Sequence, residues 1–278
     1  MPFRAVIFDI GGVVVGSPVA AIGDAERLWH LPRHYLNVAI TAAGPNGPFQ
    51  RLERGELELD EFYVRFGAEL SDVRRNNEAY RQYCQRAGID CPPLPEEVKV
   101  DGKLLWSMMM EPATEPDPVV VTAVNRLRAS RRFKVAALTN NFASPGHKPT
   151  RHRPSPPYTH PISADELRTA LKATAADEGG GSKGSGNDVL RSLFDGYIES
   201  CVEGLRKPDS RFFQLALDRL GVKAEETVFL DDIGHNLAAA AKLGIKTIQV
   251  KHGRSSEAMT QLEQLLDVDL GARSKSKL

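Results

Sequence analysis

The sequence predicts an α/β protein built from a parallel sheet with a small inserted helical cap. Short runs rich in Val, Ile and Phe alternate along the chain with helical patterns, which is the order that places parallel strands side by side. The runs are almost continuously apolar, as expected for strands that helices cover on both faces. A long helical or irregular stretch follows the first run, and this interruption predicts the insertion.

The elements of the expected Rossmann-like core follow in chain order. Strands are predicted where apolar runs have turn or polar residues on both sides, at residues 4–8, 133–139, 227–231 and 246–250. Helices are predicted where apolar residues recur at helical spacing or alanines gather, at residues 117–131, 209–220 and 234–243. The βαβα order of these elements indicates a doubly wound sheet.

The domain organisation follows from where this alternation stops. We expect a core formed by residues 1–18 and 113–252, and a helical cap formed by residues 19–112, which contain no convincing strand. Residues 253–278 are expected to form a C-terminal helix and a frayed tail.

Residues 143–188, a segment rich in Pro, Gly and Ser, interrupt the predicted core. Such a segment buries too little apolar surface to offset the entropy lost on ordering, so we expect a mobile surface loop with a short helix at 163–176. The histidines of this loop lack cysteine partners and helical HxxxH spacing, so we expect solvated side chains rather than metal ligands. They are His147, His152 and His160.

Composition excludes several classes of function. Lys plus Arg total 36 and Asp plus Glu total 36, so no charge excess indicates a nucleic acid or membrane partner. The cysteines Cys84, Cys91 and Cys201 form neither a disulfide framework nor a CxxC metal signature. No apolar run is long enough to span a bilayer and no secretory signal begins the chain, so a cytoplasmic location is expected.

Polar residues stand where the predicted strands end. Asp9 ends the first strand, Thr139-Asn140-Asn141 ends the second, and Asp231-Asp232 ends another. Because ligands of open α/β sheets bind at the carboxyl ends of the strands, these side chains are expected to converge. Lys207 precedes Pro208 and a helix whose cap is Asp209 or Ser210. Each of these residues by itself is equally compatible with a turn or a solvated surface.

Together these residues suit phosphoryl transfer. A carboxylate such as that of Asp9 can attack phosphorus and form an aspartyl-phosphate. Asp9 and a phosphate dianion repel each other, so a divalent cation must lie between them, and Mg²⁺ suits a site with Asp9 and Asp231 as ligands and Asp232 as an anchor. The hydroxyl of Thr139, the backbone N–H groups after it and the Lys207 ammonium would then bind the phosphoryl oxygens.

The segments FDIGG, LTNN, RKPD and FLDDIGHN, in this order, resemble the four motifs of the haloacid dehalogenase (HAD) superfamily. The stretch YIESCVEGLRKPD is similar to the subgroup that contains the N-terminal phosphatase domain of soluble epoxide hydrolase. The resemblance implies that Asp9 is the nucleophile and that Asp231 binds Mg²⁺. It further implies phosphate or substrate binding by Thr139, Asn140 and Lys207, with support from Asp232 and Asn236.

One residue departs from the family pattern. Family phosphatases usually carry a second Asp two residues after the nucleophile, as a general acid, and this chain has Gly11 there. The resemblance leaves Gly11 the role of offering its backbone carbonyl to the metal. Loss of a general acid typically slows catalysis by about 10²–10⁴-fold. We expect Gly11 and Gly12 to turn the backbone sharply toward a bound phosphate, although a plain tight turn predicts the same glycines.

The preferred interpretation is a Mg²⁺-dependent phosphatase that acts on a small phosphorylated metabolite. The alternatives are a metal-independent 2-haloacid-type dehalogenase and a catalytically impaired binding protein with the same fold. Within the cap, Trp29, His30, Tyr35 and Trp106 either line the cleft or fill the interior, and the interior is the commoner place for aromatic residues. A homo-oligomer is compatible with the sequence.

Overall fold

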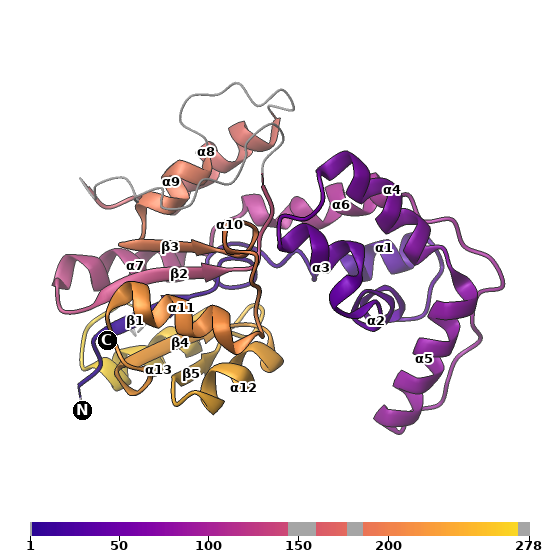
Figure 1. The fold of residues 1–278 in the computed structure, drawn as a ribbon. Helices are drawn as coiled ribbons and strands as arrows, with labels where there is room; N and C mark the ends of the chain where they lie inside the picture. Colours follow the sequence, from indigo (N-terminus) through magenta and orange to yellow (C-terminus); the bar gives the residue numbers. More distant parts are fainter. Residues whose placement is uncertain (1, 144–159, 177–185, 272–278) are drawn as a thin grey trace, which may run out of the picture.

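The computed structural model describes residues 2–143, 160–176 and 186–271, and its centre is a parallel sheet (Figure 1). The five strands lie in the order β3-β2-β1-β4-β5, and every pairing between neighbours is parallel. This arrangement confirms the predicted fold class. The strands are β1 (Ala5–Phe8), β2 (Lys134–Thr139), β3 (Gly196–Glu199), β4 (Thr227–Asp231) and β5 (Lys246–Gln249).

Helices on both faces of the sheet complete the core. They are α7 (Pro118–Ser130), α8 (Ala164–Ala176), α9 (Gly186–Ser192), α10 (Ser200–Glu203), α11 (Ser210–Leu220), α12 (Gly234–Lys242) and α13 (Ser255–Leu266), with the 3₁₀ turns η2 (Pro112–Thr114) and η3 (Ala224–Glu226). Of the two caps predicted for α11, the structure has Asp209, whose side chain accepts from the Arg211 N–H.

Strand β3 was not predicted, and its position explains why. It is a four-residue strand at the edge of the sheet, and its first two residues, Gly196 and Tyr197, are only half-buried. An edge strand of this kind lacks the continuous apolar run that marks a strand covered on both sides. Residues 144–159 and 177–185 of the predicted loop, with His147 and His152, and residues 272–278 of the predicted tail lie outside the described residues.

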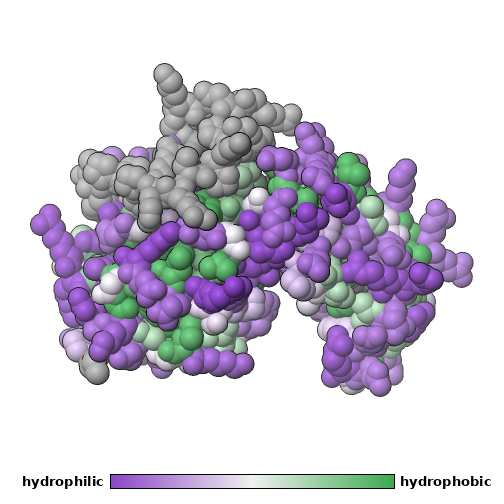
Figure 2. Space-filling model, in the orientation of Figure 1, coloured by the Kyte–Doolittle hydropathy of each residue, from purple (hydrophilic) through white to green (hydrophobic). Residues whose placement is uncertain are grey.

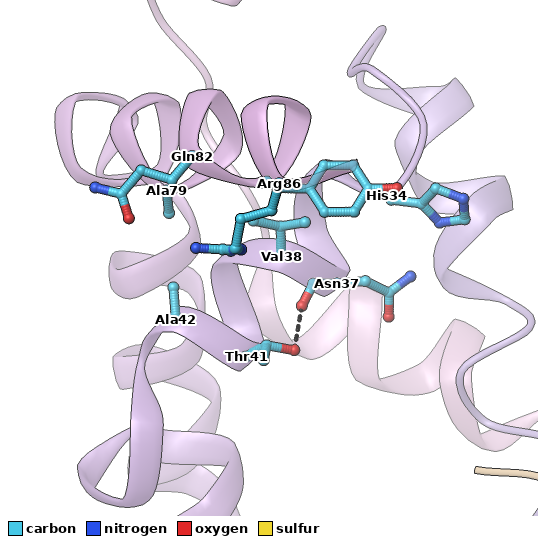
Figure 3. Close-up of a pocket in the computed structure, with 9 residues that line it drawn as sticks. His34, Asn37, Val38, Thr41, Ala42, Ala79, Gln82 and Arg86 are labelled. Atoms are coloured by element: carbon cyan, nitrogen blue, oxygen red, sulfur yellow. Dashed lines mark hydrogen bonds between the residues drawn. The ribbon is translucent and has the colours of Figure 1, made fainter. Parts of the chain in front are cut away.

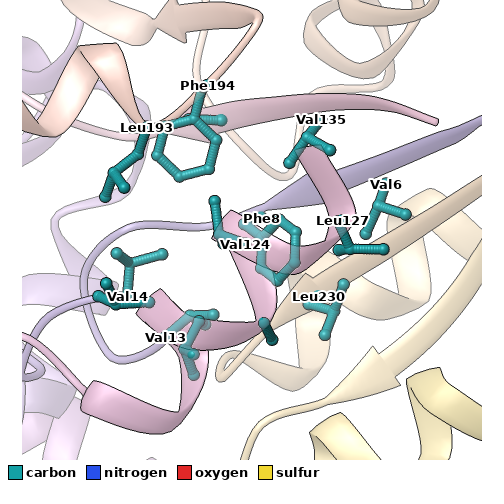
Figure 4. Close-up of a cluster of buried hydrophobic side chains, with 14 of the residues drawn as sticks. Val6, Phe8, Val13, Val14, Val124, Leu127, Val135, Leu193, Phe194 and Leu230 are labelled. Atoms are coloured by element: carbon teal, nitrogen blue, oxygen red, sulfur yellow. The ribbon is translucent and has the colours of Figure 1, made fainter. Parts of the chain in front are cut away.

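Two apolar clusters hold the helices on the sheet. On one face, Val6 and Phe8 of β1 pack with Val135 of β2 and with Val124 and Leu127 of α7 (Figure 4). On the other face, alternate residues of the same strands contact α11 and α12. These residues are Ala5, Ile7, Ala136 and Leu138. Because side chains alternate across a strand, each of these continuous apolar runs supplies both clusters.

The segment from residue 19 to residue 112, here called the helical insertion, lies beside the carboxyl ends of the strands (Figure 1). It contains α1 (Ile22–Leu28), α2 (Tyr35–Ala42), α3 (Pro48–Glu53), α4 (Leu59–Leu70), α5 (Val73–Ala87) and α6 (Gly102–Met110), with the 3₁₀ turn η1 (Gly44–Asn46), and no strand. A separate apolar cluster that includes Tyr35, Phe62 and Phe66 fills its interior. Figure 2 shows hydrophilic side chains over most of the visible face of the insertion, as expected for a surface in contact with water.

Candidate active site

The sheet brings the predicted acids to one place. Phe8 is paired with Ala137 of β2 and with Leu230 of β4, so Asp9, the residue after Phe8, lies level with the ends of both neighbouring strands. The Asp9 N–H donates to the Leu230 carbonyl at 2.8 Å. Oxygens of Asp9, Asp231 and Asp232 all lie within 4.8 Å of one another. The convergence that strand order predicts is therefore present for these three residues.

Lys207 joins two of these acids. Its Nζ lies 2.8 Å from Asp9 Oδ1 and 2.8 Å from Asp231 Oδ2, and the residue is only 1% exposed. The ammonium also lies 5.3 Å from the centroid of the Phe229 ring. A buried lysine needs charged partners to remain protonated, and here two carboxylates provide them. The solvated position that remained open for Lys207 is thus excluded.

The negative charges of the acids in this cluster outnumber its positive charge. Burial raises the pKa of Asp9 well above its usual range, and although the Lys207 ammonium opposes this, Asp231 and Asp232 add to it. Burial pushes the pKa of Lys207 down, but the Asp231 and Asp9 carboxylates outweigh it and raise that pKa. Three acids against one lysine leave an excess of negative charge when all are ionised, so the site favours an additional cation.

Hydrogen bonds from residues that follow Asp231 in the chain hold its carboxylate in one orientation. Its Oδ1 accepts from the Ile233 N–H at 2.8 Å. The side-chain amide of Asn236, on α12, donates to Asp231 Oδ1 at 3.2 Å and to Oδ2 at 3.1 Å. The structure therefore places Asn236 beside the predicted metal ligand, and its contacts here are with protein.

Asp232 has an oxygen that protein groups do not satisfy. Ser17 Oγ donates to its Oδ2 at 3.3 Å, whereas its Oδ1 is buried with no hydrogen-bond partner among the described residues. Burial and the neighbouring Asp231 raise the pKa of Asp232 to about 6. A buried carboxylate oxygen without a partner, next to two further carboxylates, fits a hard cation such as Mg²⁺, which binds oxygen ligands.

The two glycines after Asp9 behave differently. Gly12 has φ +81°, and a Cβ at this position would lie 2.1 Å from Asp232 Oδ2, so only glycine lets the turn approach that acid. Its N–H donates to the Val15 carbonyl at 2.8 Å. The expectation that both glycines direct their backbone toward a phosphate is thus wrong for the Gly12 N–H. Gly11 has no positive φ, and a Cβ there would lie 3.0 Å from Cδ of Pro18.

The residues after β2 tie the neighbouring segments to this edge of the sheet. Asn140 Oδ1 accepts from the Lys207 N–H at 2.8 Å, and Asn140 Nδ2 donates to the Lys207 carbonyl at 3.1 Å. Asn140 therefore fixes the backbone that carries the lysine. Thr139 is buried, and its hydroxyl makes only a long 3.4 Å contact with the Asn140 carbonyl.

Asn141 anchors the same loop to β3 and α10. Its N–H donates to Ser200 Oγ at 2.9 Å, and its side-chain Nδ2 donates to Glu199 Oε1 at 2.7 Å. The Cys201 thiol contacts Asn141 Oδ1 at 3.2 Å. The backbone N–H and the side-chain amide of Asn141 are therefore both bonded to protein groups.

Sequence reasoning missed residues whose partners lie far away in the chain. Ser17, bonded to Asp232, and Glu199, bonded to Asn141, carry no local signal because each acts through a residue from another segment. The one available signal is proximity in sequence, because Ser17 follows the FDIGG segment and Glu199 lies within YIESCVEGLRKPD.

The aromatic residues of the insertion lie mainly in its interior, which was the commoner of the two places expected for them. Tyr35 and Trp106 are buried members of its apolar cluster, and Trp29 packs partly against it. His30 is exposed, at a turn with φ +53°. Trp106 also meets Phe142, from the loop after β2, with ring centroids 4.6 Å apart. This contact links the insertion to the predicted phosphate loop.

A groove of about 620 Å³ lies elsewhere, between α2 and α5 of the insertion (Figure 3). In Figure 3, Gln82 and Arg86 from α5 face Thr41 and Ala42 from α2 across it. The groove contains none of the residues predicted for catalysis or metal binding. No helix among the described residues is both long and apolar enough to cross a membrane.

The fold is that of an α/β protein with a parallel sheet, and the carboxylate–lysine cluster lies at the carboxyl ends of its strands, where ligands of such sheets bind. The chain belongs to the haloacid dehalogenase-like hydrolases, whose family model matches residues 3–244. The resemblance inferred from the motifs is thereby confirmed.

Two curated proteins are similar to nearly the whole chain. It is 32% identical to acyl-CoA dehydrogenase family member 10 of Mus musculus, over 96% of this chain and 20% of that protein. It is 28% identical to bifunctional epoxide hydrolase 2 of Sus scrofa, over 97% of this chain and 40% of that protein. The chain thus spans less than half the length of these relatives.

Among solved structures, a predicted HAD-like family hydrolase from Porphyromonas gingivalis is similar with a TM-score of 0.51 and 19% identity. The likeness covers 94% of this chain and 98% of that one. At this identity it shows the fold alone.

Proposed function

We propose that this protein is a Mg²⁺-dependent phosphatase that acts on a small phosphorylated metabolite through an aspartyl-phosphate on Asp9. The observation that carries the proposal is the buried cluster in which Lys207 contacts both Asp9 and Asp231 beside the unsatisfied Oδ1 of Asp232. Carboxylates and a lysine at the ends of parallel strands supply a nucleophile, cation ligands and a donor for phosphoryl oxygens.

The hydrogen bonds of Asp9 support different roles for its two carboxylate oxygens. Oδ1 accepts from the Ile10 N–H at 2.7 Å and from Lys207, which holds the carboxylate in one orientation. Oδ2 is the oxygen that we assign to attack. It forms a bond to phosphorus as the P–O ester bond breaks, and the electron pair leaves with the alcohol or phenol oxygen. Water then attacks phosphorus, the bond to Asp9 breaks, and inorganic phosphate is released.

The cation would be held by Asp9, Asp231 and Asp232, and it would neutralise charge between the carboxylate and the phosphoryl group. The remaining donors belong to the chain itself. The Thr139 hydroxyl and the Asn140 N–H follow β2, and the Lys207 ammonium arrives from the segment before α11. Their role is to bind the phosphoryl oxygens, whose charge is spread over them in the transition state.

Gly11 limits which esters react. With no carboxyl group at this position, the leaving oxygen must take its proton from water, so substrates with good leaving groups are favoured. A metabolite with an acidic leaving group, such as an acyl or enol phosphate, meets this condition without a general acid.

A phosphatase assay on an activated aryl phosphate tests the proposal. We expect turnover that requires Mg²⁺ and that Asp9→Asn abolishes, because the amide cannot form the covalent intermediate. The matched control is Asp60→Asn, which changes an exposed acid of α4 and is expected to leave turnover unchanged. Halide release from 2-chloropropionate without metal, or a folded protein that is inert toward aryl and acyl phosphates, would contradict the proposal.

A further inference from the structure

An ion pair joins the helical insertion to the segment that carries Lys207. Arg206 Nε lies 2.5 Å from Oε2 of Glu53, the last residue of α3. The two side chains are only 23% and 11% exposed. As far as the described residues show, the other ion pairs of the insertion join two insertion residues. The Glu53–Arg206 pair is therefore a specific connection between the two parts of the molecule.

The backbone approaches closely at the same point. Gly55, in the turn after α3, has φ +70°, and a Cβ there would lie 2.5 Å from the Cys201 carbonyl oxygen of α10. The end of α3 thus contacts both α10 and the segment that follows it. Two contacts close together in space fix the position of this turn more firmly than a single ion pair would.

The segment from Arg206 to Lys207 is held from two sides. Asn140 of the core bonds both the N–H and the carbonyl of Lys207, and Glu53 of the insertion binds the adjacent Arg206 side chain. The Lys207 ammonium in turn contacts Asp9 and Asp231. A shift of the insertion would therefore act on the backbone of the lysine through Arg206.

Each residue of the buried pair compensates the charge of the other. Burial raises the pKa of the Glu53 carboxyl, and the Arg206 guanidinium opposes that rise. Removing one partner of a buried pair leaves a charge without compensation, which is strongly unfavourable. Substitution of either residue by a neutral one therefore disfavours the docked position of the insertion.

We propose that Glu53 is a positioning residue that, by holding Arg206, couples docking of the insertion to the alignment of Lys207. The inference rests on the phosphatase function proposed above and extends it by assigning a role to the insertion. Displacement of a catalytic group by about 1 Å can lower a rate by about 10²-fold, so a small movement of this segment suffices.

Kinetics of Glu53→Gln and Arg206→Gln with an aryl phosphate test the role. We expect kcat to fall by about 10- to 100-fold, while the affinity for Mg²⁺, measured by calorimetry, stays that of the wild type. Because both residues act through one contact, the double variant should lose no more than the larger single loss. Glu61→Gln removes an exposed pair with Arg65 on α4 and serves as the control. Wild-type kcat in both single variants would overturn the inference.

Small-angle scattering provides a readout that is independent of turnover. We expect a larger radius of gyration for Glu53→Gln and Arg206→Gln than for the wild type and Glu61→Gln, because the insertion is released from α10. If circular dichroism shows that one variant does not fold, the radius of gyration of the other variant still tests the docking role. If the wild type is inert, the proposed phosphatase function fails, and an unchanged radius in the variants then overturns the docking role as well.

Discussion

At the residue scale, the site depends on how closely charged groups and backbone approach one another. Lys207 lies 2.8 Å from two carboxylates. At position 12, only glycine lets the turn after Asp9 pass against Asp232. Both residues are determined by contacts with acids that lie far along the chain. Substitutions at the two glycines therefore test the geometry of the site directly.

Gly12→Ala is expected to abolish Mg²⁺ binding and turnover. The new Cβ would lie 2.1 Å from Asp232 Oδ2, so Asp232 or the turn must move. Gly88→Ala is the matched control, since Gly88 also has a positive φ of +64° but open space around it. Both variants carry the strain of a left-handed residue, about 1–2 kcal/mol. Calorimetric Mg²⁺ titration should separate them, and equal affinities would contradict the assignment of Asp232.

Gly11→Asp is expected to raise turnover of alkyl phosphates relative to aryl phosphates, because it supplies a proton for a poor leaving group. A Cβ at residue 11 would lie 3.0 Å from Cδ of Pro18, so the gain should be larger in the double variant with Pro18→Ala. The measurement is the ratio of kcat/KM for the two substrate types. A ratio unchanged in both variants means that the missing acid is not the limiting feature.

At the scale of elements, the ends of helices and strands are completed by side chains from other elements. The N-cap of α2 is His34, whose own side chain makes no cap hydrogen bond. Glu26 of α1 replaces it, because its Oε2 accepts from the His34 N–H at 2.8 Å and its Oε1 from the Leu36 N–H at 2.9 Å. A buried acid is thus used to satisfy the start of the next helix.

Glu26→Gln tests this cap through stability. The amide offers one acceptor where the carboxylate offers two, so we expect a loss of about 1–3 kcal/mol in the free energy of unfolding. Burial raises the pKa of Glu26 above its usual 4.5 in the folded protein. The wild type therefore loses stability as pH rises through that raised pKa, whereas glutamine does not titrate.

The advantage of the wild type over Glu26→Gln should accordingly shrink from pH 4.5 toward pH 8, as measured by urea unfolding. Glu58→Gln, at an exposed acid before α4, should show no such trend. An advantage that grows with pH would contradict the raised pKa.

At the scale of the whole molecule, two apolar clusters of the core and one of the insertion form separately and meet at few points. The points of contact include the Trp106–Phe142 ring pair and the Glu53–Arg206 ion pair. Both lie next to residues of the proposed site, so we expect the relative position of the two parts to affect catalysis.

Mg²⁺ is expected to stabilise the whole fold, because the three acids carry an excess of negative charge that the ion offsets. Binding to the folded state alone raises the unfolding free energy by about 2.7 kcal/mol at a ligand concentration of 100 times Kd. Thermal unfolding with Mg²⁺ and with chelator measures the effect. The shift in Tm should vanish in Asp231→Asn and persist in Asp60→Asn, and an equal shift in both would place the ion elsewhere.

Local pattern sufficed for much of this fold. The continuous apolar runs predicted β1, β2, β4 and β5 to within a residue or two, because strands covered on both faces need apolar side chains throughout. Strand β3 escaped because an edge strand needs fewer apolar residues. The convergence of Asp9, Asp231 and Asp232 was predictable, since parallel strands end at the same edge.

The sequence by itself thus determined the fold class, the strand ends that carry acids, and the chemical types of side chain available there. Only the tertiary structure decided that Lys207 is buried between two carboxylates, that Asn140 bonds the lysine backbone, and that Glu53 reaches Arg206. The reason is physical. Apolar periodicity reports the local environment of a segment, whereas the partner of a charged group is chosen when chain closure brings distant residues together.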